Sequence, residues 1–316
     1  MKRKIALVCA AAMALSLAAC GNTASESTTS ESTASESSSA TAEAAGTEAA
    51  ASDFDNTQAI TVITREEGSG TRGAFIELTG VEEKNDAGEK VDNTSAGAAT
   101  QNSTNGVMTT VANDETAIGY ISLGSLNDTV KAVTVGGVAA SAETVKDGTY
   151  TLARPFNIVT NGDATDPVAV DFINFCMSAD GQALATEEGY IGSDDAAAFE
   201  STQPSGSITV GGSSSVSPLM EKLIEAYEGV NPNASLELLT TDSTVGVSGA
   251  LDGTYTIGMA SRELKDSEVE AGAKATVLAM DGIAVVVNPA NPIEDLTTEQ
   301  IKSIYTGETT TWDAIQ

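Results

Sequence analysis

The segment Ser207–Tyr227, SITVGGSSSVSPLMEKLIEAY, predicts a strand, then a turn of glycines and serines, and then a helix. After the turn, apolar side chains recur on one helical face at Leu219, Leu223, Ile224 and Tyr227. Such a turn directs unpaired backbone N–H groups and hydroxyls toward one point, where the helix N-terminus adds a partial positive charge. The segment is therefore suited to bind an anion; the alternative is that its serines only cap the helix.

Two further segments repeat the pattern of strand, turn and helix. The strand-like run Ile60–Thr64 leads into Arg65 and the turn Glu66–Arg72, EEGSGTR. Arginine presents a planar fork of donors that matches a tetrahedral oxyanion. The third turn, Asp242–Gly246, follows the strand-like Ser235–Leu239. Three such turns in one chain favour an oxyanion site over helix capping alone.

Composition narrows the function. The chain has 316 residues, 45 Asp and Glu against 15 Lys and Arg, a net charge of −30 and no histidine. Nucleic-acid binding is disfavoured because it requires a basic face. The lack of histidine removes the usual serine–histidine pair and the commonest zinc ligand, so we expect neither an enzyme such as a phosphatase nor a metal or other cofactor.

The N-terminal sequence predicts export. The basic start MKRK and the apolar run Ile5–Leu17 are typical of a signal peptide, residues 1–19, and the run is too short to be read as a spanning helix. The motif LAACG is similar to the lipoprotein processing box, in which Cys20 would be lipidated; the alternative is a plain secretory signal. Residues 20–56 are rich in Ser, Thr, Ala and Glu and predict a disordered tether. Cys176 lies in an apolar run and is interpreted as a core residue.

The remaining chain alternates predicted strands and helices, which indicates an α/β fold with mostly parallel sheets. The length of 316 residues permits one large or two medium domains. The predicted strands are 60–64, 118–122, 157–160, 207–210, 236–239 and 283–288, and the predicted helices are 74–79, 167–178, 217–229 and 298–305.

Six stretches closely resemble the phosphate-binding proteins of bacterial phosphate ABC transporters. They are GSITVGGSSSVSPLMEKL, STVGVSGALDGTYTIGMASRELKD, DGIAVVVNPANPIEDLTTEQIKSIYTGETTTW, TREEGSGTRGAF, IGYISLGSL and FINFCMSADGQALATEEGYIG, and the resemblance covers residues 57–316. It implies a two-lobe, type II periplasmic-binding-protein-like fold with two crossing strands between the lobes. The implied protein is a monomeric, lipid-anchored extracellular receptor that hands inorganic phosphate to a membrane permease. The alternatives are the same fold with another oxyanion (sulfate, arsenate, molybdate or tungstate) or a sensor that has lost transport.

The order of these stretches is rotated relative to that resemblance, because TREEGSGTR precedes the serine turn. We interpret the order as a circular permutation in which residues 193–205 join the former ends. The lobes would then be residues 57–155 plus 281–316, and residues 156–280. Gln316 should lie beside the strand that starts near Ile60. The rival interpretation is a truncated or misassembled gene product.

The resemblance also assigns site residues. It implies phosphate contacts from Ser214, Ser215, Ser243, Ser261, Arg65, Ser69, Gly70 and Thr71. Ser261 stands where several family members place an aspartate that accepts the phosphate proton, so selectivity against sulfate or arsenate is less secure than binding itself.

Six further residues are expected to support the site. Glu67 would orient Arg65, the alternative being a solvated acid in the first helical turn. Arg262 would either contact the ligand or pair with Glu263 or another surface acid. Thr244 and Gly246 would shape the third turn, and Asn102 and Ser103 would line the cleft.

Overall fold

The computed structural model describes residues 54–315. The predicted signal peptide, the lipidation site Cys20 and residues 20–53 of the predicted tether lie outside the described residues. Within the described part, no helix combines the length and the apolar character needed to cross a bilayer.

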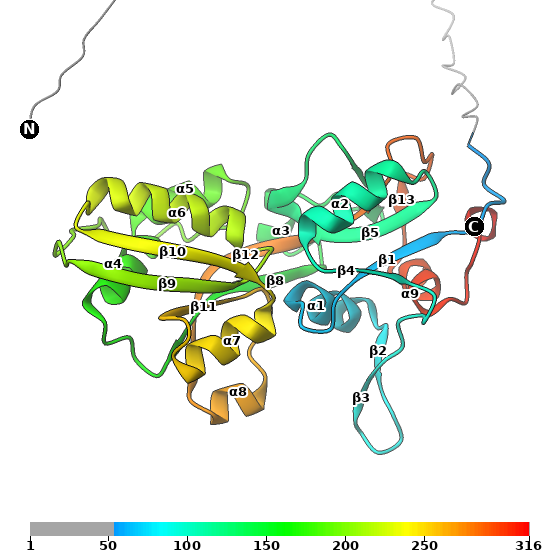
Figure 1. The fold of residues 1–316 in the computed structure, drawn as a ribbon. Coiled ribbons are helices and arrows are strands. Elements are labelled where there is room, and N and C mark those ends of the chain that lie inside the picture. Colours follow the sequence, from blue (N-terminus) through cyan, green and yellow to red (C-terminus); the bar gives the residue numbers. More distant parts are fainter. Residues whose placement is uncertain (1–53, 316) are drawn as a thin grey trace, which may run out of the picture. The chain divides into compact units, whose positions relative to one another are not determined.

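The described chain alternates strands and helices, as predicted (Figure 1). The strands are β1 Thr61–Arg65, β2 Glu82–Lys84, β3 Lys90–Asp92, β4 Ala99–Gln101, β5 Ala117–Ser122, β6 Lys131–Ala132, β7 Thr134–Val135, β8 Ala153–Asn161, β9 Gly206–Ser213, β10 Ala234–Thr241, β11 Ile257–Ala260, β12 Ala273–Val287 and β13 Asp295–Leu296. The α-helices are α1 Gly70–Thr79, α2 Thr104–Asn113, α3 Ala142–Lys146, α4 Pro167–Cys176, α5 Ala179–Glu187, α6 Ser217–Val230, α7 Ser243–Asp252, α8 Asp266–Glu270 and α9 Thr298–Thr306; two 3₁₀ turns are η1 Leu123–Ser125 and η2 Trp312–Ala314.

One sheet runs through both halves of the described chain, in the order β10-β9-β11-β8-β12-β5-β1-β4, with β6 beside β12. The pairs at its two ends are parallel, as predicted. The prediction of mostly parallel sheets is wrong for the centre, where β8 pairs antiparallel with β11 and β12, and β12 pairs antiparallel with β5. The reason is that β8 and β12 cross between the halves in opposite directions, a feature that a count of alternating elements does not reveal.

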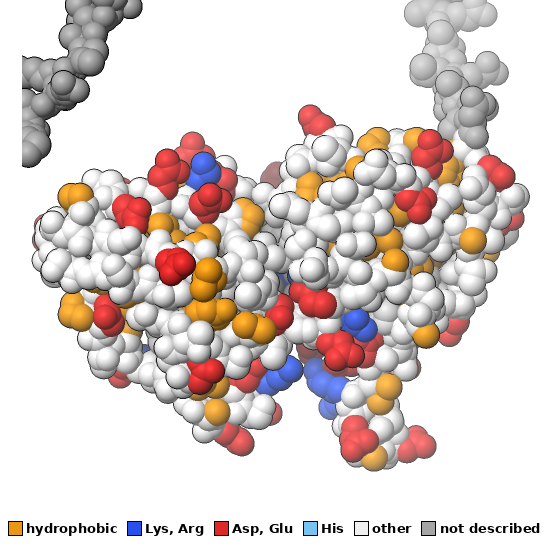
Figure 2. All heavy atoms as spheres, in the orientation of Figure 1, with side chains coloured by type: hydrophobic (Ala, Val, Ile, Leu, Met, Phe, Trp, Pro, Cys, Tyr) orange, Lys and Arg blue, Asp and Glu red, His pale blue; other side chains and the backbone are white. Residues whose placement is uncertain are grey.

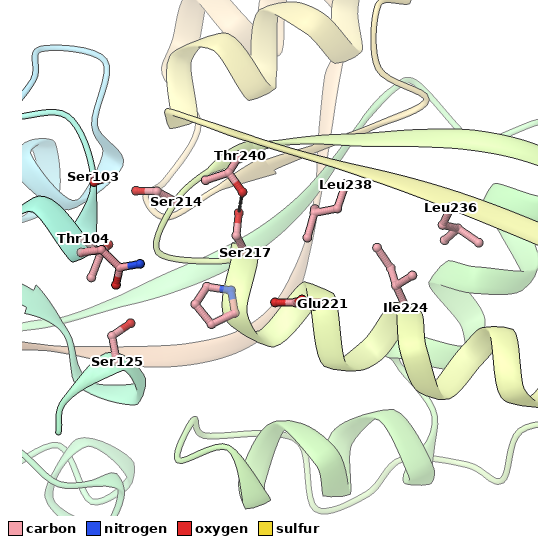
Figure 3. A pocket seen from close by; sticks show the side chains of 12 residues that line it. Ser103, Thr104, Ser125, Ser214, Ser217, Glu221, Ile224, Leu236, Leu238 and Thr240 are labelled. Carbon is pink, nitrogen blue, oxygen red and sulfur yellow. Dashed lines mark hydrogen bonds between the residues drawn. The ribbon is translucent and has the colours of Figure 1, made fainter. Parts of the chain in front are cut away.

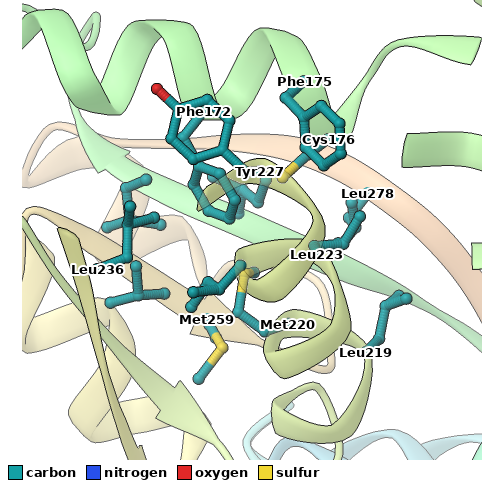
Figure 4. Close-up of a cluster of buried hydrophobic side chains, with 14 of the residues drawn as sticks. Phe172, Phe175, Cys176, Leu219, Met220, Leu223, Tyr227, Leu236, Met259 and Leu278 are labelled. Carbon is teal, nitrogen blue, oxygen red and sulfur yellow. The ribbon is translucent and has the colours of Figure 1, made fainter. Parts of the chain in front are cut away.

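Buried side chains form a separate core on each side of these crossing strands. The core of the α6 half, whose buried residues lie between 156 and 279, packs helices α4 and α6 against the sheet (Figure 4). It includes Cys176, which is fully buried as predicted, and burial raises the pKa of its thiol. The core of the α1 half is formed by residues before 153 and after 282. In it the rings of Phe75 and Tyr120 are stacked, with their centroids 3.9 Å apart.

The two ends of the described chain lie side by side. The backbone N–H of Ile60 donates to Thr310 O at 2.8 Å, and the N–H of Asp313 donates to Asn56 O at 2.8 Å. Phe54 meets the ring of Trp312 edge-on. Residues 54–56 therefore pack against the folded part instead of belonging to the tether, and residues 310–315 lie beside the start of β1; Gln316 itself is outside the described residues.

The segment 193–205 is fixed to the α6 half through the buried carboxylate of Asp171 on α4. That carboxylate accepts hydrogen bonds from Ser201 Oγ at 2.7 Å, from the N–H and hydroxyl of Thr202, each at 2.9 Å, and from Tyr227 OH at 3.0 Å. Burial by itself raises the pKa of Asp171, but the hydrogen bonds from Thr202, Ser201 and Tyr227 outweigh it and lower the pKa below its usual value.

We expect Asp171→Ala to lower the free energy of unfolding by about 2–3 kcal/mol, because hydrogen bonds to a charged acceptor are lost and buried donors are left unpaired. A depressed carboxyl pKa contributes stability above the unfolded pKa, near 4, that is lost as pH falls through the folded value. Urea unfolding at pH 7 and at pH 3 tests both points, with Asp128→Ala at an exposed position as the control. An equal effect of Asp171→Ala at the two pH values would contradict the assignment.

Candidate functional site

The three predicted turns meet where strands of the two halves end and helices begin. Strand β1 leads through the turn at Ser69 into α1, β9 leads into α6, and β10 leads into α7. Ser69 caps α1 by accepting from the N–H of Arg72, and Asp242 caps α7 by accepting from the N–H of Val245. Helix α6 has no side-chain cap. The carboxyl ends of parallel strands and the N-termini of helices are the usual ligand-binding edge of an α/β sheet.

Arg65 and two threonines of the α1 half reach the serine turn of the α6 half. Arg65, 2% exposed at the end of β1, donates from Nη2 to Ser214 Oγ at 3.0 Å. Ser215 Oγ lies 2.8 Å from Thr71 Oγ1 and 3.2 Å from Thr104 Oγ1. These contacts join residues 111 to 149 positions apart and bring the predicted Arg65, Thr71, Ser214 and Ser215 together.

A second group of buried hydroxyls lies at the N-terminus of α7. Ser261 Oγ is 2.9 Å from Ser213 Oγ and 3.3 Å from Ser243 Oγ, which also accepts from the N–H of Ser261 at 3.0 Å. Gly70 faces this group so closely that a Cβ at residue 70 would lie 2.4 Å from Ser243 Oγ and 2.7 Å from Ser261 Oγ. Only glycine permits α1 to begin so near to the hydroxyls of the other half.

The third turn also contacts the α1 half directly. Thr244 donates to Gly68 O from its backbone N–H at 3.1 Å and from its hydroxyl at 3.2 Å. Gly246 has a packing role, because a Cβ there would lie 2.4 Å from Met259 O. Thr244 therefore holds the halves together, and Gly246 lets α7 lie against the sheet.

The partner of Arg65 is Glu66, so the expectation that Glu67 orients Arg65 is wrong, and the exposed Glu67 agrees with the alternative of a solvated acid. The Glu66 carboxylate accepts two hydrogen bonds from the Arg65 guanidinium, from Nε at 2.8 Å and from Nη2 at 2.7 Å. Glu66 directly follows β1, and its side chain reaches back to Arg65. Glu67 is the next residue of the turn, and its side chain is exposed. Arg72 completes the arrangement by donating from Nη1 to Arg65 O at 2.7 Å.

Arg262 pairs with an acid, which is one of the two predicted alternatives, but the acid is Glu268. Both terminal nitrogens of Arg262 lie 2.8 Å from the Glu268 carboxylate, and only the backbone carbonyl of Glu263 is contacted. Burial by itself raises the pKa of Glu268, and the hydrogen bonds from Arg262 and Lys265 lower it below its usual value.

A cavity of about 550 Å³ lies beside the serine turn and is lined from both halves (Figure 3). Ser103, which caps α2, lines it as predicted, together with Thr104 and Ser214, and the exposed Asn102 does not. Away from the turn the cavity wall becomes apolar, at Leu236 and Leu238.

A second cavity of about 690 Å³ opens between α1 and the segment after β11. Its charged lining residues are four cations and four acids: Lys90, Arg154, Arg262 and Lys265, with Glu77, Glu82, Glu263 and Asp266. Figure 2 shows Lys and Arg side chains on both sides of the hollow between the two halves, whereas Asp and Glu predominate over the rest of this face. The charges that line this cavity are thus balanced, in contrast to the chain's net charge of −30.

Sequence reasoning missed several residues of the site. Ser213 directly precedes the predicted Ser214, and Thr104 directly follows the predicted Ser103. These neighbouring positions in the sequence could have identified both residues. Arg154 and Asp281 form a buried ion pair, with Arg154 Nη2 at 3.0 Å from Asp281 Oδ2, and no local sequence motif marks them. Burial raises the pKa of Asp281 to about 6, although Arg154 and Ser122 act to lower it.

Chemically, the site offers hydroxyls, helix N-termini and one guanidinium from two facing surfaces. Donors of this kind around one point match an oxyanion.

Comparisons with known proteins agree with this geometry. The family model described as PBP superfamily domain matches residues 23–180 and 197–315. The chain is 51% identical to phosphate-binding protein PstS 2 of Streptococcus agalactiae over 253 residues, 80% of this chain and 86% of that protein. It is 44% identical to PstS 2 of Streptococcus pneumoniae over 269 residues, 84% of this chain and 91% of that protein. A crystal structure of a phosphate-binding protein of a phosphate ABC transporter from S. pneumoniae is similar with a TM-score of 0.66 at 43% identity, covering 82% of this chain and 100% of that one.

We expect Gly70→Ala to separate the start of α1 from Ser243 and Ser261, because its Cβ would overlap their hydroxyls. Hydrogen–deuterium exchange at the Thr244 amide, which donates to Gly68 O, should then accelerate. Gly73→Ala on the same helix is the matched control, since its Cβ would meet only Arg262 Cδ at an ordinary 3.7 Å. Equal exchange in the two variants would show that the close approach at residue 70 does not hold the halves together.

Proposed function

The chain belongs to the PBP superfamily and, within it, to the family of phosphate-binding proteins, and on that premise we propose that it captures inorganic phosphate between its two halves. The observation that carries the proposal is the Arg65–Ser214 contact, which aims a buried guanidinium at the N-terminus of α6 from the opposite half. Members of this family are substrate-binding transport proteins, which is not a class of enzyme.

The proposed phosphate contacts come from both halves. Arg65, Ser69, Gly70 and Thr71 supply charge, hydroxyl and N–H donors from the α1 half. The α6 half supplies Ser214, Ser215, Ser243 and Ser261. The hydroxyls that now bond to one another across the cleft are the groups that would turn to phosphate oxygens, while the N-termini of α1, α6 and α7 favour negative charge.

An acidic protein can bind an anion at such a site because the surface field is screened within about 10 Å by salt, whereas buried donors act at short range. The contribution of Arg65 is central, since it is the charged donor that contacts the serine turn.

Selectivity is the open chemical question within this proposal. Ser261 is a hydroxyl where several family members have an acid, and its lone pairs could accept the proton of a phosphate. It would not repel a fully ionised dianion as a carboxylate does. Sulfate, arsenate, molybdate or tungstate is accordingly the second candidate ligand, and Ser261 is the observation that favours it.

The two lobes, residues 57–155 plus 281–316 and residues 156–280, are proposed to close on phosphate by bending at β8 and β12. Hinge closure about two crossing strands is a common mode of ligand capture. The contacts of Thr71 and Thr104 with Ser215 would break in the open form.

We further propose that the protein works as a monomeric, lipid-anchored receptor on the extracellular face of the membrane. Residues 1–19 would be the signal peptide, Cys20 the lipid-bearing residue, and the segment after it a tether. The closed protein would deliver phosphate to the permease of a phosphate ABC transporter.

The rotated segment order is proposed to be a circular permutation with residues 193–205 as the joining segment. Two observations support it: residues 310–315 lie beside the start of β1, and the similarity to the S. pneumoniae structure covers all of that chain in one alignment. That coverage argues against a misassembled gene product.

Arg65→Ala should weaken phosphate binding by at least ~2 kcal/mol, or about 30-fold, because a buried charged donor is lost. Calorimetric titration of wild-type and variant protein with phosphate, and separately with sulfate, measures this. Lys302→Ala, which removes an exposed cation on α9, is the control and should bind as the wild type does. Unchanged affinity in Arg65→Ala would place Arg65 outside the site, and equal heats with sulfate would favour a less selective receptor.

A further inference from the structure

The two crossing strands are joined near the start of β8 by a buried ion pair. Arg154 on β8 and Asp281 on β12 are register partners in the antiparallel ladder, and they are 2% and 1% exposed. Arg154 Nε and Nη2 lie 3.2 and 3.0 Å from Asp281 Oδ2. Asp281 Oδ1 accepts from Ser122 Oγ at 2.8 Å, at the end of β5. The pair is therefore anchored in the α1 half.

On its other side the pair reaches the anion site. Arg154 Nη1 donates to Ser261 O at 3.2 Å, and the N–H of Ser261 donates to Ser243 Oγ. The next carbonyl, that of Arg262, accepts from Asn157 Nδ2 at 2.8 Å, also on β8. Two side chains of β8 thus hold the backbone just after β11, where the ladder hydrogen bonds of β11 with β8 have ended at Ala260.

The charge of Arg154 is balanced within the pair, because the Asp281 carboxylate lies 3.0 Å from Arg154 Nη2. Burial lowers the pKa of Arg154, and Asp281 raises it.

Fold stability alone does not account for such a pair. Replacing a buried ion pair with uncharged side chains of similar volume is often neutral or stabilising, because two charges must be desolvated to form it. Arg154 also donates a hydrogen bond to the backbone carbonyl of Ser261, which an apolar side chain at this position could not do.

We propose that Arg154 is a positioning residue of the anion site: it holds the backbone of Ser261 in place from behind. Asp281 and Ser122 fix its orientation. The inference rests on the proposed phosphate-binding function and names a residue that would act on the ligand through Ser261.

The test compares three proteins by calorimetric titration with inorganic phosphate, with thermal unfolding measured in parallel. In the neutral-pair variant Arg154→Met/Asp281→Asn, both charges are removed together, so no uncompensated charge remains. We expect its phosphate affinity to fall at least about tenfold, a loss of ~1.4 kcal/mol, with a melting temperature near that of the wild type. Arg154→Lys keeps the charge but loses the guanidinium fork, and should bind more weakly than wild type and more tightly than the neutral-pair variant.

Lys274→Met/Asp163→Asn is the matched control. It removes both charges of an exposed ion pair in which one partner, Lys274, also lies on β12. It should leave phosphate affinity unchanged. A neutral-pair variant that binds phosphate as tightly as wild type would overturn the inference while leaving the proposed function intact. So would Arg154→Lys binding no more tightly than the neutral-pair variant. If the neutral-pair variant does not fold, wild-type affinity in Arg154→Lys overturns the inference. A wild-type protein that binds no phosphate overturns the proposed function and this inference together.

Discussion

The hydrogen bond from Arg65 to Ser214 joins the end of β1 to the start of α6, and much of the remaining structure serves to make it possible. Glu66 orients the guanidinium, and Arg72 holds the backbone carbonyl of Arg65. Gly70 allows α1 to begin against the hydroxyls of the other half. The two cores on either side of β8 and β12 provide rigid bodies on which these groups meet.

Local sequence pattern predicted the parts of the site that lie in turns. The turns, with Arg65 before one of them, were predicted because each turn sits between a strand-like run and a helix, where free N–H groups gather. The fold was predictable for the same reason, since the strands and helices alternate. The resemblance to phosphate-binding proteins assigned Thr71, Ser214 and Ser215 individually, and it also supplied the two-lobe arrangement.

What could not be predicted depends on contacts distant in sequence. Arg65 pairs with Glu66 and not with Glu67 because of how the turn folds, which the sequence does not show, since both acids follow Arg65 within two positions. Arg154 and Asp281 are 127 positions apart and become neighbours only through antiparallel pairing of the crossing strands. That antiparallel centre was itself missed, because alternating elements suggest parallel pairing.

The central claim is that both halves hold one phosphate at the Arg65–Ser214 contact. A crystal structure of the protein grown with phosphate tests it most directly. The account predicts a phosphate whose oxygens lie within hydrogen-bond distance of the Arg65 guanidinium and of the hydroxyls of Ser214 and Ser215. Phosphate bound by only one half, or at another place on the protein, would contradict it.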